Sequence, residues 1–157
     1  MPRKLTASDV VEVTGYSRQE LRLILEALPY YRDQKSFPRK AREFSRHDLI
    51  ALGVVQALEV RYGMRKDAIA TIFDLLRNAL LGPKRQNSQA HLLISIDPPA
   101  VSYREAPTKG SEGILVPLES VFARVDHHLG SYPGSVREQR DVLSPALISG
   151  RRKSANP

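Results

Sequence analysis

The stretch from residue 5 to residue 28 constrains the fold of this chain more than any other segment. Its apolar residues recur at spacings of three and four, the pattern of a helix with one buried face, and Gly15 divides them into two sets. The two sets are Ala7, Val10 and Val11, and then Leu21, Ile24, Leu25 and Leu28. The sequence therefore predicts two short helices, over residues 6–14 and 17–28, joined by a tight turn. Pro29 has no N–H to donate, so we expect it to stop the second helix.

The start of the second predicted helix carries long polar side chains. Ser17 followed by Glu20 three residues later is the sequence pattern of a capping box, which fixes where a helix begins. The residues left exposed at this end are Arg18, Gln19 and Arg22. Guanidinium and amide groups at this end of the second helix of a helix-turn-helix reach base edges and phosphates in the DNA major groove.

The positive charge of the chain is concentrated in the same half. Net charge is +7, and residues 1–90 hold 16 Lys and Arg against 10 Asp and Glu, whereas residues 91–157 hold 8 against 7. Clustered Lys and Arg gain affinity for a polyanion by displacing its counterions, so we expect double-stranded DNA as the partner. A solvated basic surface without a partner is the alternative.

Residues 30–44 show no helical period and carry a basic centre. Tyr30, Tyr31, Phe37 and Phe44 are spaced to anchor a small two-stranded hairpin, which we interpret as a wing. The side chains placed to touch the DNA backbone are Arg39, Lys40 and Arg42. An irregular linker of the same composition is the alternative.

The remaining chain predicts a mainly α (α+β) fold. Two further helices, over residues 45–62 and 64–81, complete a four-helix domain at residues 1–82, and the first of them is expected to be central and buried. A polar linker at 83–90 precedes strands at 91–97, 101–105 and 113–116 and a helix at 118–130. Because the apolar stripe of residues 91–130 belongs to a segment too short for a core of its own, we expect this unit to mediate dimerisation. Residues 131–157 are expected to form a partly disordered tail.

From Leu5 to Leu81, half of its length, the chain resembles the MerR-type winged helix-turn-helix transcriptional regulators. The matching motifs are Thr14-Gly15-Tyr16-Ser17, Leu21-Arg22, Arg42-Glu43-Phe44-Ser45, Asp48-Leu49 and Gly63-Met64-Arg65-Lys66-Asp67-Ala68-Ile69. The resemblance implies base or backbone contacts from Ser17, Arg18, Gln19 and Arg22, and phosphate contacts from Arg39, Lys40 and Arg42. Tyr16 is expected to pack at the turn. The cysteine-based metal sensing of the family is excluded, because the chain has no cysteine.

Other chemistry is not expected. His127 and His128 are neighbours on a predicted helix and point about 100° apart, so we interpret them as surface histidines at a helix end, and we expect no metal and no cofactor. No nucleophile, base and stabiliser occur in a pattern that indicates an enzyme. The absence of a signal peptide pattern or an apolar stretch of membrane-spanning length predicts a cytoplasmic protein that does not enter a membrane.

Three functions are compatible with these patterns. The first is a sequence-specific transcriptional regulator acting on DNA as a homodimer. The second is an architectural DNA-binding protein of a mobile element or phage, such as an excisionase-like directionality factor or a DNA-packaging small subunit. The third is an adaptor that uses its helix pair to contact protein. The operator, the sign of regulation and any small-molecule effector cannot be deduced from the sequence.

Overall fold

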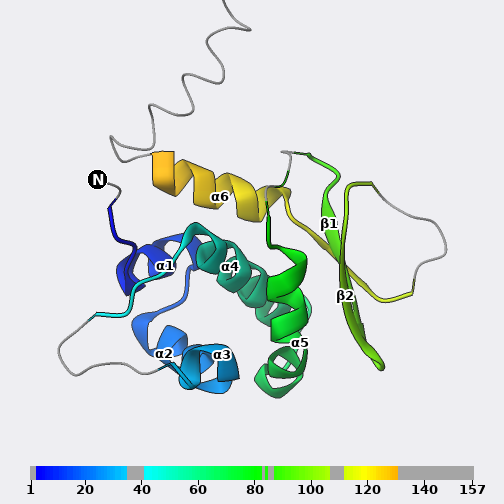
Figure 1. Ribbon diagram of the computed structural model, residues 1–157, viewed down its shortest axis with the longest axis horizontal. Coiled ribbons are helices and arrows are strands. Elements are labelled where there is room, and N and C mark those ends of the chain that lie inside the picture. Colours follow the sequence, from blue (N-terminus) through cyan, green and yellow to red (C-terminus); the bar gives the residue numbers. More distant parts are fainter. Residues whose placement is uncertain (1–2, 35–40, 83, 85–86, 107–111, 131–157) are drawn as a thin grey trace, which may run out of the picture.

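The computed structural model describes residues 3–34, 41–82, 84, 87–106 and 112–130. Within these residues the fold is mixed α+β, with six helices and one three-stranded antiparallel sheet, and helix predominates. The helices of the first half lie to one side and the sheet to the other, while the last helix crosses above them (Figure 1). The class predicted from the sequence, mainly α with a smaller β part, is confirmed at this level.

The first half is built around one buried helix. Helix α4 (Arg46–Val60) buries residues on every side, as its sequence predicts. It packs against α1 (Ala7–Thr14) and α5 (Lys66–Ala79). Helix α2 (Arg18–Ala27) packs against α1 and α5. Ser45 caps α4 by accepting the Asp48 N–H at 3.1 Å. Helix α4 therefore begins at the position that the sequence predicts.

Pro29 does more than stop α2. Helix α2 ends at Ala27, Leu28 is extended, and Pro29 opens a further short helix, α3 (Pro29–Arg32). The expectation that residues 30–44 contain no helix is therefore wrong for their first turn. The physical reason is that proline is well suited to the first position of a helix, where no N–H is required.

The α3 turn places an aromatic and polar cluster between α4 and α5. The Tyr31 hydroxyl donates to Asp48 Oδ1 at 2.7 Å, and Arg77 Nη2 lies 3.1 Å from the same oxygen. The Arg77 guanidinium also lies over the ring of Tyr30, 3.9 Å from its centre. Asp48, on α4, thus links α3 and α5 to its own helix.

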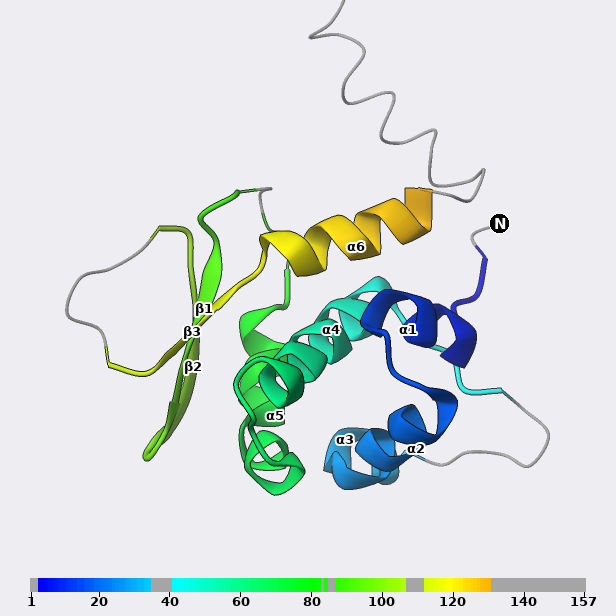
Figure 2. The ribbon, with the colours of Figure 1, turned by 180° about the vertical axis from the view of Figure 1, so that it is seen from behind.

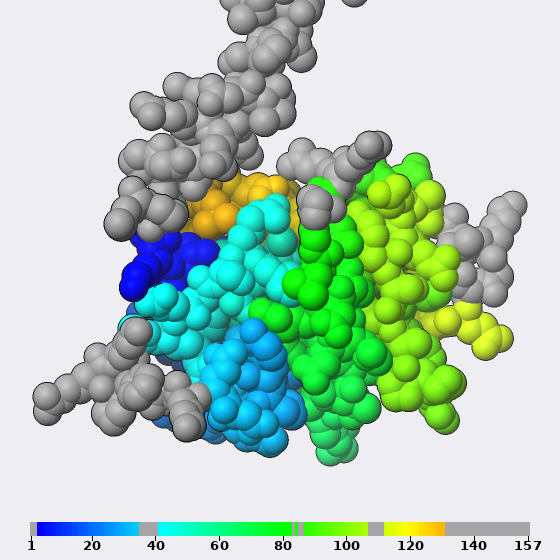
Figure 3. Space-filling model, in the orientation of Figure 1, coloured from blue at the N-terminus to red at the C-terminus, as the bar shows by residue number. Residues whose placement is uncertain are grey.

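The sheet contains β1 (His91–Ile96), β2 (Pro99–Arg104) and β3 (Ile114–Pro117) in the order β2-β1-β3. β1 is antiparallel to both neighbours, and its second residue, Leu92, lies opposite Tyr103 on one side and Val116 on the other. The apolar face formed by these residues packs towards the helices, with α5 against β2. In the space-filling view, α5 (green) lies between the α2–α3 region (blue) and the sheet (yellow-green) (Figure 3).

Helix α6 (Glu119–Gly130) packs across α4 and α1 of its own chain. Both ribbon views place it on the side of α4 opposite to α2 and α3 (Figures 1 and 2). Val121, Phe122 and Val125 are buried there, so the apolar stripe that suggested a dimerisation surface is covered within one chain. This stripe therefore does not support a dimer, and the homodimer stays a prediction.

The two halves of the chain share one core. Leu92, Ile94 and Val125 belong to the same cluster of buried side chains as Leu49 and Phe73. Leu118 also donates its N–H to the carbonyl of Ala90 at 3.0 Å, which fixes the entry into α6. The division of the chain at residues 83–90 stays a prediction, and the expected tail lies outside the described residues.

The histidines of α6 differ from each other. His127 is exposed, as expected, but His128 is largely buried and its Nε2 lies 2.8 Å from Asp9 Oδ1 on α1. The interpretation of both residues as surface histidines is therefore wrong for His128. Arg46 and Asp126 form a second link between α6 and α4, at 2.8 Å.

Candidate nucleic-acid interface

The turn between α1 and α2 is fixed by local hydrogen bonds. Gly15 has φ +82°, a conformation that favours glycine, and its N–H donates to the carbonyl of Val11. Ser17 Oγ accepts the Glu20 N–H at 3.1 Å, and Glu20 Oε2 accepts the Ser17 N–H at 2.9 Å. The capping box predicted from the sequence is confirmed, and it sets the direction of α2 relative to α1.

Tyr16 ties this turn to the rest of the helical core. Its side chain is buried, as expected, and its hydroxyl donates to Glu59 on α4. Glu59 in turn accepts from Lys66 Nζ, at the start of α5, at 2.9 Å. Burial and then the Glu59 carboxylate raise the pKa of Tyr16 well above its ordinary value, so the phenol stays a donor at all physiological pH.

The two faces of α2 have different environments. Leu21 and Ile24 are buried in the core, whereas Arg18, Gln19 and Arg22 are exposed. Arg18 Nη2 donates to Ser8 Oγ on α1 at 2.8 Å. Gln19 and Arg22 make no hydrogen bond or ion pair to any other residue that the structure describes. Gln19 and Arg22 therefore remain open to a partner on the exposed face of a helix whose other face is buried.

The segment that follows α3 contributes Arg42. This side chain is half-buried, and its Nη1 donates to the Tyr31 carbonyl at 3.1 Å and to Gln34 Oε1 at 3.0 Å. Its guanidinium is thus oriented by the chain. The other two residues expected to touch phosphate, Arg39 and Lys40, lie outside the described residues, as does the centre of the expected wing. The end of that segment is joined to the N-terminus, where the Phe44 N–H donates to the Leu5 carbonyl at 3.0 Å.

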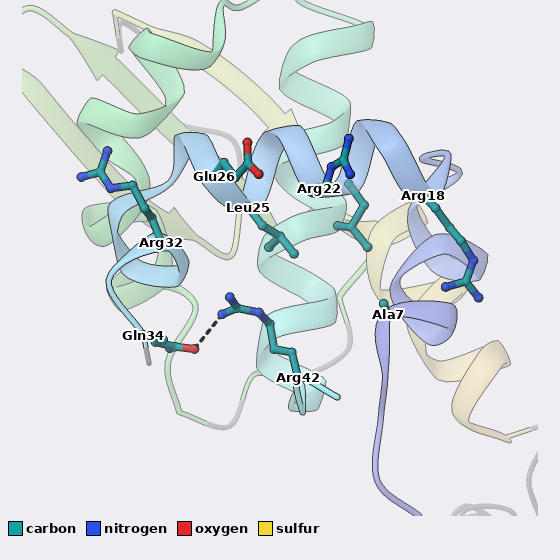
Figure 4. A pocket seen from close by; sticks show the side chains of 9 residues that line it. Ala7, Arg18, Arg22, Leu25, Glu26, Arg32, Gln34 and Arg42 are labelled. Carbon is teal, nitrogen blue, oxygen red and sulfur yellow. Dashed lines mark hydrogen bonds between the residues drawn. The ribbon is translucent and has the colours of Figure 1, made fainter. Parts of the chain in front are cut away.

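A pocket of about 350 Å³ lies between α1, α2 and the residues around Arg42 (Figure 4). Its apolar floor is formed by Ala7, Leu21 and Leu25. Its polar rim contains Arg18, Arg22, Arg32, Arg42, Gln34 and Glu26. In the close-up, Leu25 and Arg42 point into the same hollow, while Arg18 and Arg32 point away at opposite ends.

Sequence reasoning missed part of this site. Leu25 was counted with the core, but it is only half-buried and lines the pocket. Arg32 and Gln34 were not assigned a role. Their position at the pocket depends on the short helix α3, which the sequence did not predict, so no local pattern could have placed them beside α2.

Comparison of the chain with protein-family models, with curated proteins and with solved structures found no match. Among the described residues, no group of three or more His, Cys, Asp or Glu side chains is arranged to hold a metal ion. No helix in the described ranges combines the length and apolar character needed to cross a membrane.

Proposed function

We propose that the protein is a sequence-specific DNA-binding transcriptional regulator. In this proposal α1 and α2 act as a helix-turn-helix, the basic segment that follows α3 acts as its wing, and the module resembles that of the MerR-type regulators. The observation that carries it is the outer face of α2, where Arg18, Gln19 and Arg22 project from a capped helix whose other face is buried. Arg and Gln side chains form bidentate hydrogen bonds with guanine and adenine in the major groove.

Electrostatics supports the same proposal. The half of the chain that carries α2 holds most of the net positive charge. Arg42 lies beside the same pocket as Arg22, so phosphate contacts and base contacts can be made from one surface.

The decisive experiment is selection of bound fragments from genomic DNA, followed by titration of the selected duplex and a scrambled duplex at several salt concentrations. The proposal expects tighter binding of the selected duplex and a steep loss of affinity with salt. A protein with no salt-sensitive affinity for any duplex would overturn it.

The architectural alternative gains weight from one observation. A regulator that reads a two-fold site needs a dimer, and the apolar stripe of α6 is already covered by α4 and α1 of the same chain. An architectural protein that binds direct repeats has no such need. Sedimentation of the full chain with its selected duplex, combined with footprinting, separates the two. A dimer on a palindrome supports the regulator, and monomers on direct repeats support the architectural protein.

A further inference from the structure

The pocket beside α2 has a composition that DNA contact does not require. Phosphates and base edges are contacted by side chains that protrude from a surface, with no need for an apolar recess. A pocket with an apolar floor and a few convergent polar groups is typical of a site for a small molecule. Here Leu21 is fully buried beneath the pocket, and Leu25 stands half-buried at its wall.

We propose that this pocket binds a small organic anion with an apolar body, of the aryl carboxylate class, and that its occupancy excludes DNA from α2. The second part rests on the proposed DNA-binding function, whereas the first part does not.

The charge around the pocket selects an anion. Four arginines line the pocket against one carboxylate among the described residues, that of Glu26, but Arg18 and Arg32 point away from the hollow and Arg32 pairs with Asp33. Among them Arg42 is the best placed, because the Tyr31 carbonyl and Gln34 hold its Nη1 and leave Nη2 and Nε for a ligand. A guanidinium presents two parallel donors to a carboxylate. The apolar part of the ligand can pack against the neighbouring Leu25.

Competition with DNA follows from geometry. The pocket is lined by Arg18 and Arg22, two of the side chains proposed to contact the duplex. A bound carboxylate would occupy the space next to α2 and lower the positive charge that Arg22 and Arg42 present to the duplex. The same residues would therefore serve DNA or the small anion, but not both together.

The ligand site is tested on the full chain by calorimetric titration with 1-naphthoate and with the neutral analogue 1-naphthalenemethanol. We expect saturable binding of one naphthoate per chain and affinity for the neutral analogue at least about tenfold weaker, the effect of losing one charged hydrogen bond. Leu25→Asp should abolish binding, and Arg42→Gln should weaken it about tenfold. Leu23→Asp is the matched control, because Leu23 is on the same helix, is 44% exposed and does not line the pocket.

Absence of saturable binding, equal affinity for the neutral analogue, or unchanged binding by a folded Leu25→Asp variant would overturn the site. Circular dichroism of each variant establishes that it is folded. Arg42→Gln alters no buried apolar side chain and keeps the test decisive if Leu25→Asp does not fold.

Exclusion of DNA is tested by fluorescence anisotropy with a labelled selected duplex. Saturating 1-naphthoate should weaken DNA binding at least about tenfold in the natural chain, and 1-naphthalenemethanol at the same concentration should not. Unchanged DNA affinity at saturation would overturn the exclusion. A chain that binds no duplex even without naphthoate would overturn the proposed function instead, and the calorimetric titration, which contains no DNA, would still decide the ligand site.

Discussion

His128, in the last turn of α6, donates a hydrogen bond from Nε2 to Oδ1 of Asp9, in the first turn of α1, over 2.8 Å. The two residues are 119 positions apart in the chain. The same carboxylate accepts the Thr6 N–H at 2.7 Å and pairs with Arg3. One buried acid therefore fixes the start of α1 and joins it to the last described helix, next to the helix pair that is proposed to bind DNA.

Replacing His128 should loosen this junction. His128→Ala removes a partner from a carboxylate that is almost fully buried, so we expect a loss of about 1–3 kcal/mol in the free energy of unfolding. Urea denaturation measures it. His128→Gln retains an N–H donor and should recover part of the loss. Arg124→Ala, at an exposed position of the same helix, should cost less than about 0.5 kcal/mol. Equal losses in His128→Ala and Arg124→Ala would show that the Asp9 contact contributes nothing.

Acid should destabilise the protein through Asp9 and Asp48, the two buried acids among the residues that the structure describes. Burial alone would raise the pKa of Asp9, but Arg3, the Thr6 N–H and His128 outweigh it and hold the pKa below its ordinary range. Burial would also raise the pKa of Asp48, and its hydrogen bonds, led by the Ser45 N–H, outweigh it in the same way. Both folded-state pKa values therefore lie below the unfolded value.

The sign of the pH effect follows from this ordering. In the acid range the unfolded chain binds more protons than the folded chain, so the stabilisation is complete above about pH 5 and is lost as the pH falls through about 4 and below. Urea denaturation between about pH 6 and pH 3 measures the slope. Asp48→Asn, which cannot titrate, should be less stable at neutral pH and show a shallower loss on acidification. A variant with the slope of the natural chain would contradict the assignment of Asp48.

Gly53 sets the distance between α4 and α6. A Cβ built on Gly53 would lie 2.9 Å from Val121 Cγ1, closer than real carbon contacts. Gly53→Ala should therefore destabilise the protein by about 1–3 kcal/mol, although alanine is the better helix former, because the Val121 side chain or the helix that carries it must shift. Adding Val121→Ala should relieve the clash, so that the double variant loses less than the sum of the two single losses. Additive losses would place the close contact elsewhere.

The sequence predicted the local part of this fold and missed its long-range part. The Ser17 and Glu20 cap, the burial of Tyr16 and the position of α4 follow from spacing and capping chemistry, which act within a few residues. The contact between His128 and Asp9 does not, because residue pairs on separate helices leave no periodic trace in one sequence. The strand order β2-β1-β3 is a property of the same kind.

The candidate site divides in the same way. Arg18, Gln19 and Arg22 were predicted to be exposed because they fall off the apolar stripe of α2, and the structure places them so. The pocket was not predicted, since it requires α3 to bring Arg32 and Gln34 near α2. Proline at residue 29 indicated a stop, and only the tertiary packing of Tyr31 shows that a new helical turn begins there.

Arg22 is the residue whose replacement separates sequence reading from general DNA attraction. It projects from the outer face of α2 with no hydrogen bond or ion pair to another described residue, so its removal leaves no unpaired acid behind. If Arg22 contacts a base, Arg22→Ala should weaken binding to the selected duplex by about 1–3 kcal/mol and binding to a scrambled duplex much less.

Arg124→Ala is the control that removes the same charge, because Arg124 is exposed on α6, on the side of α4 away from α2. Fluorescence anisotropy at fixed salt measures the affinities of the natural chain and of both variants for the two duplexes. Equal losses on both duplexes would assign Arg22 to phosphate contact, and a loss in Arg124→Ala as large as in Arg22→Ala would mean that net charge, not the face of α2, governs binding.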